Sequence, residues 1–150
     1  MIKKKFFFLI FFFVVNCSYQ PIYSQKDNNK IIFDEIEFIG DKNINRKIAS
    51  LANLKKNKNN STSYNLIIDS SKLIETVVKD SAGNSSIYST KITVNLTLLS
   101  DNKKLRNKEF ISSFLYNNMD NKFDLSQYQK NIEKNLVNKI AEDIIIFLNS

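Results

Sequence analysis

An alternating stretch within Ile87 to Leu99 is the feature that most constrains the fold of this chain. From Tyr88 to Leu98 every second residue except Thr90 is apolar, and the residues between them are polar or charged. Because successive side chains of a strand point to opposite faces, this period of two predicts a strand with one covered and one polar face. The apolar set is Tyr88, Ile92, Val94, Leu96 and Leu98. Such a strand needs a second layer that packs on its apolar face.

Further strands are predicted on both sides of this one. Tyr64 to Lys79 predicts one long strand or two shorter ones, and a turn at Asp80 to Asn84 follows it. Ser100 to Lys103 predicts a hairpin turn, and Leu105 to Tyr116 predicts a returning strand. Ile31 to Ile39 is the first strand candidate of the chain. The returning strand has apolar residues on both faces, which indicates that part of the sheet is covered twice or covered by a partner.

A first helix is predicted to begin near Asp41 or Asn43, since either side chain can accept hydrogen bonds from the free N–H groups of a first turn. Ile44 and Ile48 then follow at helical spacing. The helix is expected to end before Lys55–Ser63, whose polar composition predicts a loop.

A long second helix is predicted at the end of the chain. Asp124 or Ser126 is expected to cap it, and Gln127 or Gln129 is expected to complete a capping box. Its continuous apolar stripe is Tyr128, Ile132, Leu136, Ile140, Ile144 and Leu148. The predicted fold is therefore α+β: a two-layer sandwich in which two helices pack on one face of a mostly antiparallel or mixed four-stranded sheet.

The first residues of the chain have the pattern of an export signal. Lys3, Lys4 and Lys5 precede an unbroken apolar run of ten residues, Phe6 to Val15. A helix that spans a bilayer needs about 20 apolar residues, so a permanent span is the weaker interpretation. An uncleaved signal anchor remains an alternative.

Cys17 is the only cysteine and directly follows this signal. Val14 to Cys17 is similar to the site at which bacterial lipoproteins are cut and acylated, although Asn16 departs from the usual small residue. The prediction is a lipoprotein signal peptide at 1–16, a lipidated N-terminus and polar tether at 17–30, and one folded domain at 31–150. A secreted protein with a chance cysteine near its cleavage site is the alternative.

Composition limits the chemistry of the chain. Of its 22 basic residues, three leave with the signal, so 19 face 15 acidic residues; this mild excess fits an anionic membrane or ligand and does not imply nucleic acid. The chain has no histidine and only two glycines, which removes the commonest general base and the phosphate-binding glycine loops. Neighbouring carboxylates such as Asp34 and Glu35 are expected to be solvated. No enzyme activity and no metal are expected, and a carboxylate hydrolase is the remote alternative.

Several segments resemble the LPS-assembly lipoprotein family LptE, in its alphaproteobacterial form. Cys17 to Ser24 keeps the aromatic–x–Pro–aliphatic–Tyr core of the family's mature start, whereas Ser18 and Ser24 replace glycines. The strand opening at Tyr64, the turns at Asp80–Asn84 and Asp101, and the Phe114–Asn117 segment before the long helix also resemble it.

This resemblance implies a protein without catalysis. LptE proteins are anchored in the inner leaflet of the outer membrane, plug and help assemble the LptD β-barrel, and bind lipopolysaccharide. Cys17 would then carry a diacylglycerol and an N-acyl chain, with no other cofactor. Ser18 is compatible with the outer membrane, because an Asp there usually retains a lipoprotein at the inner membrane. Exposed groups such as Leu115 or Tyr116 would contribute to the plug surface, and a core role for them is the alternative.

Position and charge select four candidate contacts to lipopolysaccharide on the predicted sheet and its hairpin. They are Lys91, Lys103, Lys104 and Arg106. Exposed strand and turn cations without a ligand are the alternative for these residues. The alternative function is an auxiliary envelope lipoprotein of an ABC-type lipid transport system, which would share the anchor and the size.

Overall fold

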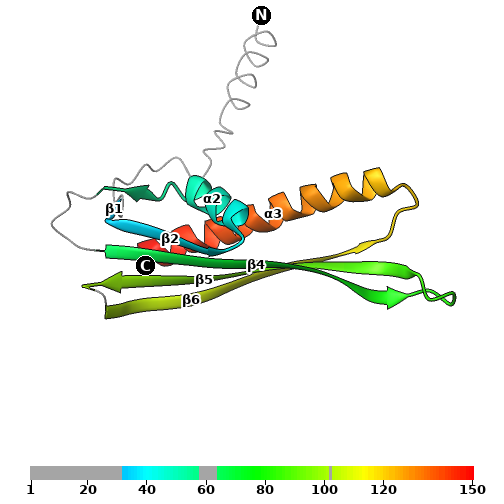
Figure 1. Ribbon diagram of the computed structural model, residues 1–150, viewed down its shortest axis with the longest axis horizontal. Helices are drawn as coiled ribbons and strands as arrows, with labels where there is room; N and C mark the ends of the chain where they lie inside the picture. Colours follow the sequence, from blue (N-terminus) through cyan, green and yellow to red (C-terminus); the bar gives the residue numbers. More distant parts are fainter. Residues whose placement is uncertain (1–31, 58–63, 102) are drawn as a thin grey trace, which may run out of the picture.

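The computed structural model describes residues 32–57, 64–101 and 103–150. These residues form two layers, with the helices on one face of a sheet of long strands (Figure 1). The predicted signal peptide, Cys17 and the tether lie outside the described residues.

The elements follow one another in the order that the sequence predicts, with two additional short strands. They are β1 (Ile32–Phe33), β2 (Glu35–Gly40), α2 (Lys42–Leu51), β3 (Lys55–Lys56), β4 (Tyr64–Lys79), β5 (Ser85–Ser100), β6 (Lys103–Asn117) and α3 (Lys122–Asn149). The predicted two-layer α+β fold is confirmed.

The main sheet is mixed and has the strand order β2-β4-β5-β6. β2 is parallel to β4, and the two following pairs are antiparallel. The first predicted strand is interrupted at Asp34, and β1 leaves the sheet to pair with β3. Phe33 is thereby fully buried. Lys55–Lys56, predicted as part of a loop, is a short strand because β1 supplies its pairing partner.

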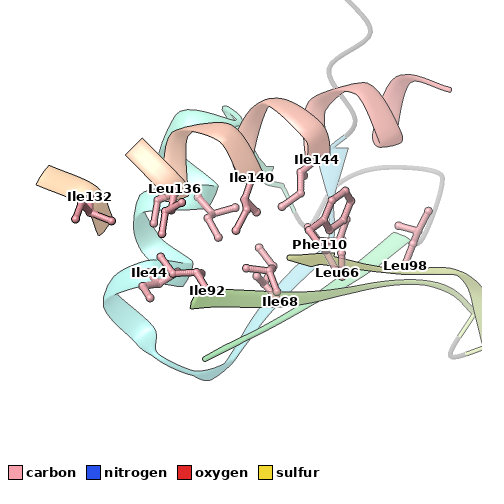
Figure 2. Packing of buried hydrophobic residues seen from close by; sticks show 14 of the residues in the cluster. Ile44, Leu66, Ile68, Ile92, Leu98, Phe110, Ile132, Leu136, Ile140 and Ile144 are labelled. Carbon is pink, nitrogen blue, oxygen red and sulfur yellow. The ribbon is translucent and has the colours of Figure 1, made fainter. Parts of the chain in front are cut away.

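The core lies between β5 and the helices, as the alternation predicts. Ile92, Val94 and Leu96 are fully buried, and Figure 2 shows Ile92 facing the apolar stripe of α3. Within that stripe Ile140 and Ile144 are buried almost completely. Burial of one such side chain contributes roughly 1.5–3 kcal/mol, so this contact is the main source of the stability of the fold.

The two helices begin at different kinds of cap. Asp41 caps α2, since its carboxylate accepts hydrogen bonds from the backbone N–H of Asn43 at 2.9 Å and of Ile44 at 3.1 Å. This confirms one of the two predicted starts. The neighbouring Gly40 adopts a positive φ of 72°, which turns the chain from β2 into the helix.

The predicted start of α3 is wrong. Its cap is Asn121, whose side chain accepts from Phe123 N at 2.9 Å, and not Asp124 or Ser126. Asn is as good a cap as Asp or Ser, so the helix gains a further turn and Asp124 lies in its first turn, where a carboxylate favours the helix dipole. Among the described residues the predicted capping box with Gln127 or Gln129 is not formed, and Gln129 instead donates to the Tyr116 hydroxyl at 2.9 Å.

The sheet becomes narrower along its length. β2 pairs with β4 only as far as Ser70, and beyond it β4 continues to Lys79 as part of a three-stranded extension. Every residue of β4 from Ser71 onward is exposed. β4 is thus one long strand whose first half builds the core and whose second half projects toward the Asp80–Asn84 turn (Figure 1).

The two glycines of the chain offer a matched test of the β2–α2 corner. Both have positive φ, but a Cβ on Gly40 would lie 2.1 Å from the Ser70 carbonyl oxygen, whereas a Cβ on Gly83 would meet nothing within 4 Å. Each Ala substitution is expected to cost ~1–2 kcal/mol for the left-handed backbone. Gly40→Ala should cost clearly more, because the clash breaks the Asp41 N to Ser70 O hydrogen bond of 2.8 Å. Urea unfolding of both variants measures this; equal losses of stability would contradict it.

Candidate functional site

A cluster of four cations lies at the start of β6. We call Lys103, Lys104, Arg106 and Lys108 the basic β6 cluster. Three of them are exposed and Arg106 is half-buried. Arg106 lies opposite the buried Leu98 of β5, so its side chain is on the face that the helices cover. Three of the four predicted ligand contacts therefore belong to one end of the sheet.

Aromatic rings of the core hold two of these cations in place. The Arg106 guanidinium lies 4.1 Å from the centroid of the Phe147 ring, and its Nη2 donates to Ser150 Oγ at 3.1 Å. The Lys108 ammonium is 5.1 Å from the ring centroid of Phe110. A cation over a ring face is attracted to the π-electrons and keeps its outer side open to an anion. Two of the four cations, Arg106 and Lys108, thus lie over aromatic rings, and Lys103 and Lys104 lie nearer the hairpin turn.

Lys108 was not predicted as a site residue. The signal for it was present in the sequence, since Arg106, Lys108 and Phe110 follow one another at every second position of one strand. Period two places all three on one face, and the packing of Phe110 against Phe147 brings the two cations to the C-terminal end of α3.

Lys91 lies far from the basic β6 cluster. It is exposed and sits opposite Leu73 on one side and Ser113 on the other. At ~3.3 Å per strand residue, the Ser113 position is roughly 30 Å along β6 from Lys104. One ligand headgroup does not span that distance, so the four predicted contacts do not form a single site.

The two residues predicted for the plug surface lie on opposite faces of β6. Leu115 is 61% exposed on the face away from the helices. Tyr116 is buried, stacks on Tyr88 at 5.8 Å, and its hydroxyl lies 3.1 Å from Thr90 Oγ1. Tyr116 is therefore a core residue, and its assignment to an exposed surface is wrong because neighbours in a strand point to opposite faces.

The face of the sheet away from the helices is uncovered by the residues that the structure describes (Figure 1). Exposed apolar side chains are spread over it, among strand positions that are otherwise polar; we call it the open face. Its most exposed apolar residues on paired positions are Ile39, Leu73, Ile111 and Leu115. Apolar groups in water favour contact with a partner.

One carboxylate joins the helix layer to the sheet. Glu133 of α3 accepts from Lys47 of α2 at 2.6 Å and from Lys72 of β4 at 2.8 Å. Burial acts to raise the pKa of Glu133, but the hydrogen bonds from Lys47 and then Lys72 outweigh it and hold that pKa below its usual range. The charged carboxylate is therefore more stable in the folded protein than in the unfolded chain.

Because the pKa of Glu133 is lowered by folding, its contribution to stability should depend on pH. A carboxyl group whose pKa is depressed by folding stabilises the protein above its unfolded pKa and stops doing so as the pH falls through its folded pKa. Glu133→Gln is expected to lose about 0.5–1 kcal/mol of stability at neutral pH, and this loss should shrink progressively as the pH falls through the lowered pKa of Glu133. Denaturant unfolding at several pH values measures this, with the exposed Glu142→Gln as control. A pH-independent difference would contradict the assignment.

Within residues 32–57, 64–101 and 103–150, no group of three or more metal-ligating side chains comes together. In the same ranges no helix is long and apolar enough to cross a bilayer. Of the neighbouring carboxylates considered above, Glu35 is exposed and forms a 3.4 Å ion pair with Lys56.

The described residues define a domain in which two helices cover one face of a long mixed sheet and leave the other face bare. Solved structures share this fold. Rare lipoprotein B from Shewanella oneidensis superposes with a TM-score of 0.60 at 15% identity, over 77% of this chain and 93% of that chain. A minor lipoprotein from Acinetobacter baumannii gives 0.60 at 9% identity, over 77% and 88%. Lipoprotein B from Nitrosomonas europaea gives 0.56 at 13% identity, over 75% and 80%.

By sequence alone, no protein-family model and no curated protein matches the chain. The structural likeness therefore establishes a common fold at identities of 15% or less.

Proposed function

We propose that this chain is a lipoprotein of a Gram-negative outer membrane, acylated on Cys17, with its folded domain on the periplasmic side. More narrowly, we propose that it is an LptE-type protein of lipopolysaccharide assembly, the class to which rare lipoprotein B belongs. The Cys17 to Ser24 pattern favours the alphaproteobacterial form of that class.

The observation that carries the proposal is the coincidence of two independent features. The fold matches rare lipoprotein B over almost the whole of that chain. The sequence ahead of the fold places a lone cysteine directly after an export signal. A lipid anchor and this particular domain on one chain together favour an LptE-type protein.

We propose that the open face of the sheet lies against an LptD-type barrel. The three-stranded extension of β4, β5 and β6 presents a long surface with the exposed Leu73, Ile111 and Leu115 on it. Apolar groups set among polar ones suit the wall of a partner that is itself partly hydrated. No step of this role makes or breaks a bond, so no catalytic group is required.

We propose that the basic β6 cluster binds the phosphates of lipopolysaccharide. Hydrogen bonds from Lys and Arg to phosphate are the strong, charge-assisted kind, and a guanidinium can form two at once. Arg106 suits this role best, because Phe147 holds it at a fixed position and leaves its charge at the surface. Lys103 and Lys104 extend the positive charge toward the hairpin turn.

A triple substitution tests the ligand assignment. Lys103→Ala, Lys104→Ala and Arg106→Ala together should weaken lipopolysaccharide binding by at least about tenfold, which is ~1.4 kcal/mol. A matched control removes three exposed cations from other elements, Lys42, Lys79 and Lys139, so that the net charge changes equally.

The measurement is the affinity of fluorescent lipopolysaccharide for the two triple variants and for Lys91→Ala. If the site is local, the control triple variant and Lys91→Ala should bind with the affinity of the unchanged protein. Equal affinities of the two triple variants would contradict the assignment of the basic β6 cluster.

A further inference from the structure

One edge of the main sheet lacks the features that usually protect an edge strand. β6 is the last strand in the order β2-β4-β5-β6, and no strand of the described residues pairs with its outer side. Its segment Phe110–Asn117 contains no charged residue and no proline, and its register with β5 is uninterrupted. We call this segment the uncharged edge. Natural proteins shield such edges with charges, prolines or bulges, because the free backbone groups pair readily with another strand.

The other edge positions of the same sheet are protected. The first half of β6 carries the basic β6 cluster, and its register with β5 is irregular at Leu105. On the opposite side β2 is short and carries Glu35 and Glu37. Beyond Ser70 the free side of β4 has charges of both signs, and its register with β5 is irregular after Thr76. The contrast confines a strand-pairing site to the uncharged edge.

One backbone hydrogen bond shows which residues of the uncharged edge are free to pair. The N–H of Asn118, directly after β6, donates to the carbonyl oxygen of Ser86 in β5 at 2.8 Å. In an antiparallel ladder alternate residues direct both of their backbone groups to the same side. The even-numbered residues of this segment therefore pair with β5. Ile111, Ser113 and Leu115 direct their N–H and C=O groups outward.

Phe114 is an exception on the face of β6 that the helices cover. Ser112 and Tyr116, two residues before and after it, are buried, whereas Phe114 is 46% exposed. A hollow of about 160 Å³ lies beside its ring, and the other residues that line it, such as Tyr128 and Asn135, all belong to α3. A large aromatic side chain half in water on a covered face indicates packing that one copy of the domain leaves incomplete.

We propose that two copies of this chain pair through their uncharged edges as antiparallel strands, with Ser113 of one copy opposite Ser113 of the other. This register places the outward backbone groups of each copy opposite those of the other, and Ile111 of each copy opposite Leu115 of the other. Phe114 then lies opposite Ser112 of the second copy and diagonally beside its Phe114, a spacing that aromatic side chains bridge. The pairing goes beyond the proposed function and leaves the open face exposed.

Charge and symmetry favour a second copy as the occupant. In this register the cationic first halves of the two β6 strands extend away from each other, so their like charges are not opposed. The two-fold axis is perpendicular to the sheet, so the helices of both copies lie on one side of a continuous sheet. Each uncharged edge is used once, and the assembly therefore closes as a dimer and does not grow into a fibre.

A disulfide between like positions tests the contact. The full-length protein is extracted from membranes and purified in mild detergent without any barrel partner. Paired residues that exchange both backbone hydrogen bonds have Cα atoms about 5.5 Å apart, within the range of about 4.4–6.8 Å that a disulfide allows. Ser113→Cys is therefore expected to form a cross-linked dimer on mild oxidation. The unchanged protein, which has Cys17 alone, gives the background.

Lys91→Cys is the matched control, because Lys91 is exposed and lies opposite Ser113 on β5 of the same copy. In the dimer its two copies would be three strand spacings, about 14 Å, apart, so it should not cross-link. Equal cross-linking of Ser113→Cys and Lys91→Cys would overturn the proposal, since it would indicate random collision in the micelle.

A mixed cross-link tests the register. Copies with Ile111→Cys should cross-link to copies with Leu115→Cys, but neither variant should cross-link to itself, because like positions would be four residues, about 13 Å, apart. Equal cross-linking in the mixed and the unmixed samples would contradict pairing centred on Ser113.

Sedimentation tests the backbone pairing without a cysteine. The unchanged protein should be a dimer that dissociates on dilution. Ser113→Pro removes the outward N–H and should sediment as a monomer, whereas Ser113→Ala keeps that N–H and should sediment as the unchanged protein does. Proline is tolerated on an edge strand where the N–H faces solvent, so both variants should unfold at similar temperatures. Dimerisation that Ser113→Pro leaves unaffected would overturn the proposal.

The dimer and the proposed function can fail separately. A protein that is monomeric at all concentrations and not cross-linked by Ser113→Cys overturns the dimer, and leaves the lipid anchor and the barrel contact as they stand. Absence of an LptD-type barrel from protein purified out of its native envelope overturns the proposed function, and leaves the dimer as it stands.

Discussion

The packing of one face of β5 against the stripe of α3 is the interaction on which the rest of the structure depends. Ile92, Val94 and Leu96 are fully removed from water by it, and Ile140 and Ile144 are the matching residues on the helix (Figure 2). Because the alternation of β5 fixes which face is apolar, it also fixes which face of every hydrogen-bonded neighbour lies under the helices. The positions of the open face and of the basic β6 cluster both follow from this single choice.

The fold places two kinds of surface at different positions of one sheet. The open face carries scattered apolar groups, and the start of β6 carries four cations, two of which lie over aromatic rings. In the proposed role these surfaces contact a barrel wall and a phosphorylated lipid, respectively. Each contact relies on charge and exposed area, and none requires a group with a chemically unusual pKa.

Much of the fold was predictable because its determinants are periodic. The alternation of β5 and the stripe of α3 are repeated many times, so single substitutions do not obscure them. The cap of α3 was predicted wrongly because Asn121, Asp124 and Ser126 are all residues that cap helices well. The choice between them depends on the residue at which β6 ends. The alternation of side chains along a strand placed Leu115 and Tyr116 on opposite faces, but it did not indicate which face the helices cover.

The candidate site was predictable in part. Three of the four predicted cations lie together, whereas the distance of Lys91 from them depends on strand register, which charge patterns do not encode.

The central claim is that the domain is the lipid-anchored partner of an outer-membrane barrel. The most direct test is to purify the tagged, membrane-extracted protein from its native envelope and to identify its partners by mass spectrometry. The account predicts stoichiometric recovery of an LptD-type β-barrel, and weaker recovery when Leu115 and Ile111 of the open face are replaced by charged residues. Recovery of inner-membrane lipid-transporter subunits without any barrel would contradict it.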